Sequence, residues 1–360
     1  MKQYRYIIFT LLTLIINGCR SENKRNYHKI IIPLNHVTKQ LNLSDFVDSV
    51  NYIPLETSNN SLIGNPGKAV YCNHYFFISD IGENKILVFD QQGKYSHSIA
   101  RLGRGPAEYA EISDFTVSPE DTTIFVGDSY GKINCYSFKG NYIKSFFTEK
   151  SILSINSVKQ KIYISTDARV YLIDSTGTIT HEFGHYDPKL LNRLNYISGG
   201  KIFPKNNSEF LFSLPYQDTI YKYSMNQITP KYVIDFGKHS IPEITPNNIQ
   251  KLNETKLKGY AYLSSMLECK HTLYLWWTNN TNRPQRYFSI INLKNQQIIH
   301  SLSSNINDNL MQTDAQFIPS SMHGENQLIG INLPILSPKL AQKLKLNEDD
   351  NPIISIYHLK

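Results

Sequence analysis

Apolar and polar residues alternate along much of the chain in short runs separated by Gly, Asn and Asp. This pattern is typical of β-strands joined by tight turns. Three segments repeat one arrangement, in which an apolar strand ends near an Asp and is followed by a second strand, a turn glycine and a third, alternating strand. The turn glycines are Gly93, Gly140 and Gly177, spaced by 47 and 37 residues. Repeats of about 40 to 50 residues that hold four short strands are typical of β-propeller blades.

Three further repeats follow with a weaker pattern. Their expected strands are Glu209–Phe212, Asp218–Tyr223 and Tyr232–Gly237 in the fourth, Leu273–Trp277, Tyr287–Asn292 and Gln297–Leu302 in the fifth, and Gln327–Asn332 with Ile353–Tyr357 in the last. A ring of sheets has no free edge only when it closes, so the C-terminal strand should share a blade with an N-terminal strand such as Val50–Leu55. The sequence therefore predicts an all-β fold, a six-bladed β-propeller.

Two stretches interrupt the strand pattern and read as short helical insertions. Thr245-Pro246 precedes an apolar stripe that ends at Gly259, and Ser337-Pro338 precedes a second stripe that includes Leu340 and Leu344. A polar cap followed by proline and then by an apolar stripe is a helix start signal. We expect both helices to cover blade edges or to roof one mouth of the central channel.

The N-terminus has the organisation of a secretory signal peptide. Lys2 and Arg5 form a basic start, Tyr6–Ile16 form an apolar run, and Asn17-Gly18-Cys19 follow. The run is too short to cross a membrane, which takes about 20 residues as a helix. Ile16 to Cys19 resemble the bacterial lipobox, although Asn17 is less usual than Ser, Thr or Ala at its position.

The lipobox resemblance implies cleavage before Cys19 and attachment of lipid to this residue. Several acyl chains on one residue suffice for stable anchoring. We predict a signal peptide at residues 1–18, a lipidated Cys and tether at 19–40, and the propeller at 41–360. The expected location is the cell envelope, lipid-anchored at the outer membrane, with the periplasmic or surface side left open. An ordinary signal peptide, with Cys19 there by chance, is the alternative.

Several motifs resemble the six-bladed β-propeller lipoproteins of Bacteroides-type bacteria, which are related to NHL-type propellers. They are Tyr52–Thr57, Phe77–Asp80, Ile86–Asp90, Gly103–Tyr109 and Ile112–Phe115. The resemblance is strongest from about residue 50 to 184, and Ala107 stands where the family motif usually has Gly. Members of that family mostly have no assigned activity. The resemblance thus implies the fold and the envelope location but no reaction.

Composition narrows the classes of partner. The formal charge is +7, from 37 Lys and Arg against 30 Asp and Glu, and no run of five or more basic residues occurs, so nucleic acid is not an expected partner. The 24 Tyr and 17 Phe favour strands over helices. Cys72, Cys135 and Cys269 are widely spaced beside apolar runs, so we expect buried free thiols and neither disulfides nor a zinc site.

His181-Glu-Phe-Gly-His185 matches the HExxH motif of zinc peptidases. That motif functions on a helix, which brings both His to one face with the Glu as base. The turn at Gly177 and the β-branched residues after it predict a strand instead. His181 also has the same offset from Gly177 that His97 has from Gly93, so it reads as a polar strand position. No metal or cofactor is predicted.

The loop Gly103–Tyr109 offers three side chains that could bind a ligand: Arg104, Glu108 and Tyr109. Gly and Pro also set turns, so the loop is alternatively a structural link between two blades, and we favour this interpretation. Its Gly-x-Gly is not a nucleotide loop, because no βαβ unit follows.

Asp80, Asp128 and Asp167 recur at the ends of predicted strands. They could hold a cation or polar substrate at the channel mouth, as in lactonase-type propellers that bind calcium. The favoured alternative is that each accepts backbone N–H groups in the following turn. Trp276 and Trp277 are adjacent in a strand and point to opposite faces, so at most one can line a sugar-binding surface.

Two functions remain after this weighing. The first is a noncatalytic binding or interaction scaffold, anchored by lipid in the cell envelope, with an envelope protein or a glycan or peptide ligand as partner. The second is a metal-dependent propeller hydrolase or lactonase. The sequence favours the first function. Each candidate nucleophile, metal-ligand cluster or carboxylate pair is better explained by a structural role than by a catalytic one.

Overall fold

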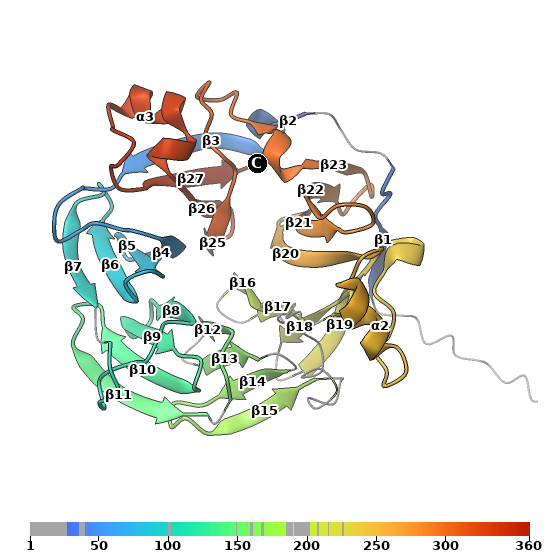
Figure 1. Cartoon of the computed structure of the whole chain (residues 1–360), viewed down its shortest axis with the longest axis horizontal. Helices are drawn as coiled ribbons and strands as arrows, with labels where there is room; N and C mark the ends of the chain where they lie inside the picture. Colours follow the sequence, from blue (N-terminus) through green and yellow to red (C-terminus); the bar gives the residue numbers. More distant parts are fainter. Residues whose placement is uncertain are drawn as a thin grey trace, which may run out of the picture.

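The computed structural model describes residues 27–35, 40–99, 102–148, 150–158, 161–166, 169–184, 190, 202–206 (backbone only), 209–214, 216–224 and 227–360. Five four-stranded sheets and one five-stranded sheet stand around a central axis as the blades of a ring (Figure 1). The arrangement confirms the predicted all-β, six-bladed propeller. The four strands that all six blades share are antiparallel to their neighbours, and one end strand of each blade lies innermost.

The first three blades contain the clear sequence repeats. Blade 1 comprises β4 (Pro66–Cys72), β5 (Tyr75–Asp80), β6 (Lys85–Asp90) and β7 (Tyr95–Ile99). Blade 2 comprises β8 (Asp114–Ser118), β9 (Thr123–Gly127), β10 (Lys132–Ser137) and β11 (Tyr142–Phe147). Blade 3 comprises β12 (Ser154–Val158), β13 (Lys161–Ser165), β14 (Val170–Ile173) and β15 (Ile179–Phe183).

The other three blades contain the weaker repeats. Blade 4 comprises β16 (Ile202–Asn206), β17 (Glu209–Ser213), β18 (Thr219–Ser224) and β19 (Gln227–Asp235), with β1 (His28–Ile31) as a fifth strand. Blade 5 comprises β20 (Ala261–Cys269), β21 (Thr272–Asn279), β22 (Gln285–Asn292) and β23 (Ile298–Leu302). Blade 6 comprises β25 (Pro319–His323), β26 (Gln327–Asn332), β27 (Ile353–Leu359) and β3 (Val47–Pro54).

The turn glycines are required by backbone conformation. Gly93, between β6 and β7, has φ +82°, and side chains other than Gly are strained at such an angle. A Cβ on Gly93 would also lie 2.1 Å from the carbonyl oxygen of Pro54 in blade 6. The Asp90 carboxylate completes the turn by accepting the N–H of Gln92 and of Lys94. The repeated Gly therefore serves both the turn and the contact between neighbouring blades.

The blades are held together by apolar side chains on their facing surfaces. Between blades 6 and 1, the fully buried Ile78 and Leu87 pack with Ile329 and Ile354. Equivalent clusters lie between the other blades. Burial of these faces stabilises the ring by roughly 25 cal/mol for each Å² of apolar surface removed from water. The core is thus divided among the interblade contacts, with a channel left on the axis.

The ring closes by pairing of the two ends of the propeller sequence. β3 pairs with β27 in antiparallel register, with Ile53 opposite Ile354. This confirms the predicted closure and removes the exposed edge that either strand would otherwise present.

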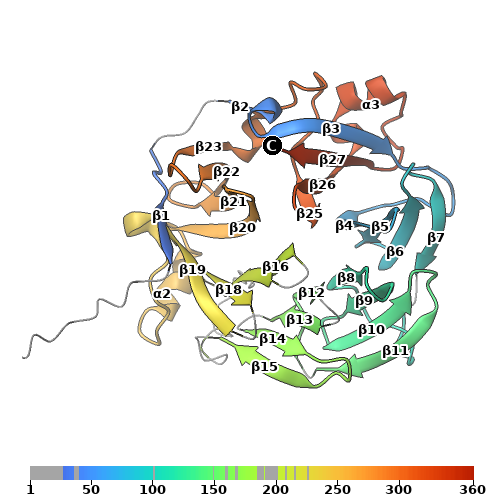
Figure 2. The ribbon, with the colours of Figure 1, turned by 180° about the vertical axis from the view of Figure 1, so that it is seen from behind.

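Two short N-terminal strands lie outside this closure. β1 pairs in parallel with β19, and both ring views place it at the outer edge of blade 4 (Figures 1 and 2). β2 (Leu41–Asn42) pairs in parallel with β24 (Ile306–Asn307), which follows blade 5. Part of the segment predicted as a tether is therefore a strand.

The two predicted helical insertions are present. α2 (Ile249–Thr255) lies between β19 and β20, and α3 (Pro338–Leu344) lies between β26 and β27. Leu252 of α2 packs with Tyr216, and Leu340 of α3 packs with Ile353. Both helices lie at the periphery of the ring, over blade edges (Figure 1). Within the described residues, no helix has the length and apolar character needed to span a membrane.

Candidate functional site: the central channel

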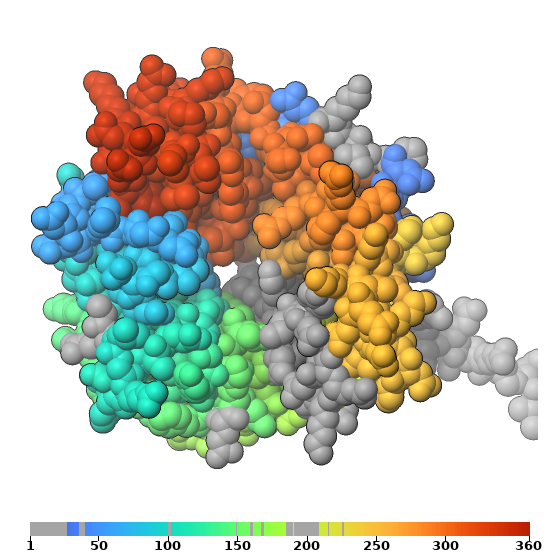
Figure 3. All heavy atoms as spheres, viewed as in Figure 1, coloured from blue at the N-terminus to red at the C-terminus, as the bar shows by residue number. Residues whose placement is uncertain are grey.

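The centre of the ring contains a cavity of about 2200 Å³. It opens between the blades in the space-filling view (Figure 3). Its described wall comes mainly from β4, β8, β12, β20 and β25, the innermost strands of five blades. Small-molecule sites usually measure about 300 to 1,000 Å³, so this channel can take an extended ligand or several groups at once.

Lys68 and Asp114 join two blades on the channel wall. The Lys68 Nζ lies 3.0 Å from Oδ1 of Asp114 and also donates to the carbonyl oxygen of Phe115. Oδ2 of Asp114 accepts the backbone N–H of Ile155 in blade 3 at 2.9 Å. The inner strands β4, β8 and β12 are linked in this way near their first residues. The charges of Lys68 and Asp114 are paired with each other.

Blades 6 and 1 meet through side chains of β25. Ser321 Oγ donates to the carbonyl oxygen of Ala69, and Nδ1 of His323 lies 3.0 Å from the carbonyl oxygen of Tyr71. A carbonyl oxygen only accepts, so His323 carries its proton on Nδ1 and Nε2 is an acceptor. Burial lowers the pKa of His323 below its ordinary value, although the bond to Tyr71 opposes this shift. The imidazole is therefore neutral near pH 7.

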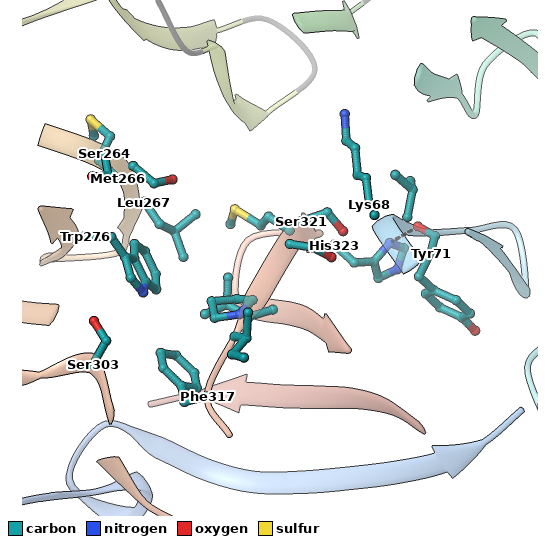
Figure 4. Close-up of a pocket in the computed structure, with 18 of the residues that line it drawn as sticks. Lys68, Tyr71, Ser264, Met266, Leu267, Trp276, Ser303, Phe317, Ser321 and His323 are labelled. Carbon is teal, nitrogen blue, oxygen red and sulfur yellow. Dashed lines mark hydrogen bonds between the residues drawn. The ribbon is translucent and has the colours of Figure 1, made fainter. Parts of the chain in front are cut away.

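The cavity extends outward between blades 5 and 6. There it is lined by Trp276 of β21 and by Ser303 as well as by the inner strand β20. Met266, Leu267 and Trp276 face Phe317 and Ser321 across this space (Figure 4). We call this part the blade 5–6 cleft and define it by Met266, Leu267, Trp276, Ser303 and Phe317.

The two tryptophans have different environments, as predicted. Trp276 is partly exposed in the cleft, and its ring stacks on Phe317 with centroids 6.1 Å apart. Trp277 is 1% exposed and packs toward blade 4, with its Nε1–H donated to Ser289 Oγ at 2.7 Å. The pair thus points to opposite faces of blade 5, and only Trp276 presents a ring to the cleft.

The structure places the Gly103–Tyr109 loop between blades 1 and 2, outside the lining of the cavity. Tyr109 is 1% exposed and donates its hydroxyl to the carbonyl oxygens of Asn84 and Ile99. The Glu108 carboxylate accepts the N–H of Gly105 at 2.8 Å. These are the contacts of a blade linker. Arg104 is exposed to solvent.

Lys132 of β10 binds the backbone of the same loop. Its Nζ donates to the carbonyl oxygens of Gly105 and Glu108. Burial lowers the Lys132 pKa, and the carboxylates of Asp128 and Glu108 oppose that shift. The Lys132 ammonium therefore holds the loop to blade 2 through two backbone carbonyl groups of the loop.

Asp80 and Asp128 bind turns and do not line the channel. The fully buried Asp80 accepts N–H groups from Gly64 and Gly82, among others. Asp128 accepts N–H groups from Tyr130 and Lys132. Both geometries are those of the turn interpretation. Asp167 lies outside the described residues.

The HExxH segment contains a strand, as predicted. His181 is exposed on β15, and Glu182 forms an ion pair with Arg169 at 2.5 Å. His185 lies outside the described residues. In the part of the chain that the structure describes, no three His, Cys, Asp or Glu side chains are arranged to hold a metal ion.

Three cysteines are buried and free, which confirms the sequence prediction for them. They are Cys72, Cys135 and Cys269. Burial raises the pKa of Cys72 to about 11 and that of Cys135 to about 12. Both thiols therefore stay protonated and weakly nucleophilic at neutral pH.

Sequence reasoning missed the charged pair and the hydroxyls of the channel. Lys68 and Asp114 are 46 residues apart, and alternation does not show which strand of a blade is innermost. Ser303 lies in a connection with no motif. The only available signal was the adjacent Trp276-Trp277 pair, which identified blade 5 as a possible ligand surface.

Comparisons with solved structures extend the fold assignment. A Bacteroides fragilis protein whose name describes it as exported is 17% identical, with a TM-score of 0.72 over 92% of this chain and 99% of that one. A DUF4221 family member from Bacteroides vulgatus is 11% identical, with a TM-score of 0.52 over 87% of this chain and 97% of that one. At these identities the likeness shows the propeller fold.

Comparison with curated proteins gives no match. The domain of unknown function DUF4934 matches residues 29–358, which is nearly the whole chain and includes every blade. This agrees with the resemblance to Bacteroides-type propellers of unassigned activity. The chain belongs to the DUF4934 family.

Proposed function

We propose that this protein is a lipid-anchored propeller of the bacterial cell envelope that binds a polar ligand in its central channel without converting it chemically. The observation that carries the proposal is the cavity of about 2200 Å³, lined mainly by neutral hydroxyl, amide, apolar and aromatic side chains. A wall of this composition suits recognition by shape and hydrogen bonding.

Three titratable groups of the channel wall support binding over catalysis. Asp114 is engaged by Lys68, and His323 by a backbone carbonyl. The buried Asp308 accepts hydrogen bonds from the Tyr52 hydroxyl at 3.0 Å and from a backbone N–H. A general base must reach a substrate proton, and a nucleophile needs such a base beside it. Asp114 and Asp308 instead hold the wall in place, and no nucleophile among the described residues is hydrogen-bonded to Nε2 of His323.

The envelope location is supported by the N-terminal pattern that ends in Cys19. The similar Bacteroides fragilis structure belongs to a protein described as exported, in agreement with a secreted or envelope location. The outer membrane is the proposed site of anchoring, and an envelope protein is a further possible partner of the exposed surface.

The binding proposal is tested on the purified chain with a library of oligosaccharides and short peptides, using calorimetry and thermal shift. We expect binding without turnover. Ser154→Trp, on the cavity wall of blade 3, should weaken binding at least tenfold. Ser96→Trp, exposed on the outer strand β7, is the matched control and should bind as the wild type does.

Catalysis is tested in the same preparation with lactone and ester substrates, with and without calcium. Turnover that depends on the metal and is lost in Ser154→Trp would contradict the noncatalytic proposal. Absence of binding by any library member, or binding that Ser154→Trp leaves unchanged, would contradict the channel as the binding site.

The anchor is tested by labelling cells with radiolabelled palmitate. We expect label on the wild-type protein and none on Cys19→Ala, with the variant recovered in the soluble envelope fraction. Label that persists in Cys19→Ala would exclude lipidation at this residue.

A further inference from the structure

Trp276 and Ser303 present hydrogen-bonding groups to the same part of the cavity. Both line the blade 5–6 cleft, Trp276 from β21 and Ser303 from the turn after β23 (Figure 4). Ser303 Oγ is buried and has no hydrogen-bond partner among the described residues. Nor does the indole Nε1–H of Trp276 donate to any described group, in contrast to that of Trp277.

Unpaired buried polar groups cost about 1 to 3 kcal/mol each. Such groups are normally satisfied by protein, water or a ligand. Of the two groups, only the Ser303 hydroxyl is fully buried, and the Trp276 donor belongs to a partly exposed aromatic ring that lines the same cleft. The cleft therefore combines an apolar face with hydrogen-bonding groups along its border.

The remaining wall of the cleft is apolar or neutral. Met266, Leu267 and Phe317 are at most 6% exposed and form the apolar floor. Ser264 and Ser321 add hydroxyl groups. Lys68 lies on the far side of the cavity from Trp276 (Figure 4), and its charge is matched by Asp114.

Asp308, a buried carboxylate of the cavity wall, has its own partners. Its carboxylate accepts from Tyr52, from the hydroxyl of Thr313 at 2.5 Å and from the N–H of Met311 at 2.9 Å. Both of its oxygens are therefore already engaged by donors of the protein. Arg286, exposed at the start of β22, is the one cation of the wall on the blade 5 side among the described lining residues.

We infer that the blade 5–6 cleft binds one ring of a neutral oligosaccharide against the Trp276 indole. This inference rests on the proposed channel-binding function and names its ligand class. A pyranose has a face of C–H groups and a border of hydroxyls, which matches an aromatic ring bordered by Trp276 Nε1 and Ser303 Oγ. The size of the channel leaves room for further sugar rings beyond the cleft.

Other ligand classes fit this wall less well. An acyl chain would leave the Ser303 hydroxyl unpaired, at the cost just given, and would give the Trp276 Nε1–H no acceptor. A short peptide brings charged ends, and the apolar and hydroxyl-bearing side chains that define the blade 5–6 cleft offer these ends no opposite charge. An uncharged polymer of hydroxylated rings can pair the hydrogen-bonding groups of the cleft and brings no charge that needs a partner.

The test uses hexasaccharides with glucose, mannose, xylose and N-acetylglucosamine backbones, titrated by calorimetry. At least one should bind. Trp276→Ala should weaken that binding at least tenfold, and Ser303→Ala should weaken it about threefold to tenfold. Trp277→Phe is the matched control for the neighbouring indole and should change affinity less than twofold. Thermal melting of each variant checks that it is folded.

Fluorescence provides a second measurement, because the chain has only two tryptophans. In Trp277→Phe the remaining Trp276 emission should shift when the sugar binds, whereas in Trp276→Phe no shift should occur. A shift that survives in Trp276→Phe would place the sugar elsewhere and overturn the inference.

The outcomes separate this inference from the proposed function. Binding of a peptide or an acidic glycan that Ser154→Trp weakens, with no binding of any neutral hexasaccharide, would overturn the carbohydrate inference and leave the channel function standing. Absence of all binding would overturn both. Neutral sugar binding that is insensitive to Trp276→Ala would overturn the cleft as the site.

Discussion

The Asp114 carboxylate of blade 2 accepts a hydrogen bond from the Lys68 ammonium of blade 1, with Nζ 3.0 Å from Oδ1. The same carboxylate accepts the N–H of Ile155 in blade 3. One side chain on the channel wall therefore joins the innermost strands of three blades. Its side chain is 15% exposed, so the interactions are shielded from water more than those of a surface pair.

Replacing this carboxylate should destabilise the ring. Asp114→Ala leaves the Lys68 charge and the Ile155 N–H without their partner, and we expect the free energy of unfolding to fall by about 2 to 3 kcal/mol. Urea denaturation at neutral pH measures the loss. Lys29→Met is the matched control, because Lys29 is 54% exposed in its pair with Asp235 and such pairs contribute less than about 1 kcal/mol. Equal losses in the two variants would contradict a bridging role for Asp114.

The closing blade should be sensitive at its interface with blade 1. Ile354 of β27 is fully buried there, opposite Ile53 of β3. Ile354→Ala removes buried methyl groups and leaves a cavity, and it should cost about 2 to 4 kcal/mol in unfolding free energy. Ile299→Ala on the outer strand β23, where Ile299 is 36% exposed, should cost less than about 1 kcal/mol. Denaturation curves that shift equally for both variants would show that the closure does not depend on this contact.

Asp218 should make stability depend on pH. Burial raises the pKa of Asp218 to about 7; a hydrogen bond with Ser240 opposes the shift, and the negative charge of Asp235 adds to it. The folded protein therefore holds this proton more tightly than the unfolded chain does. The resulting stability is complete below about pH 4 and is lost as the pH rises through about 7.

Asp218→Asn keeps a neutral side chain at every pH and removes this dependence. Between about pH 5 and pH 8 the wild type should lose about 2 kcal/mol more unfolding free energy than the variant. Urea denaturation at both pH values measures the difference, and the exposed Asp45→Asn controls for the general change in charge. Parallel pH profiles of the wild type and Asp218→Asn would show that this carboxyl has an ordinary pKa.

The blades could be predicted because their determinants are local. Each turn Gly indicates a hairpin, and the alternation of apolar and polar residues indicates the strands on either side of it. Because a closed ring leaves no exposed strand edge, β3 must then pair with β27. The pairing of β1 with β19 had no such signal. His28 pairs with Tyr232, which is far from it in the sequence. A strand of four residues is also too short to show a periodic pattern.

The channel could be predicted only in outline. Gly and Pro made the Gly103–Tyr109 loop a visible candidate for ligand binding, but Tyr109 holds this loop against blade 1. The residues that line the channel are ordinary Ser, Lys and Asp side chains, which become a site only when inner strands from several blades meet. Trp276 was the exception, because a strand must point one of two adjacent tryptophans away from the other.

Gly93 allows the effect of the interblade contact to be separated from that of the turn. Gly93 and Gly324 both have positive φ, +82° and +60°. A Cβ on Gly93 would meet the Pro54 carbonyl oxygen of blade 6 at 2.1 Å, whereas one on Gly324 meets no atom within 4 Å. Gly324→Ala should therefore cost only the conformational strain of about 1 to 2 kcal/mol. Gly93→Ala should cost about 3 kcal/mol or more, because the backbone of β3 must also move. Thermal or urea unfolding compares the two, and equal losses would show that the close approach of Gly93 to blade 6 does not constrain the ring.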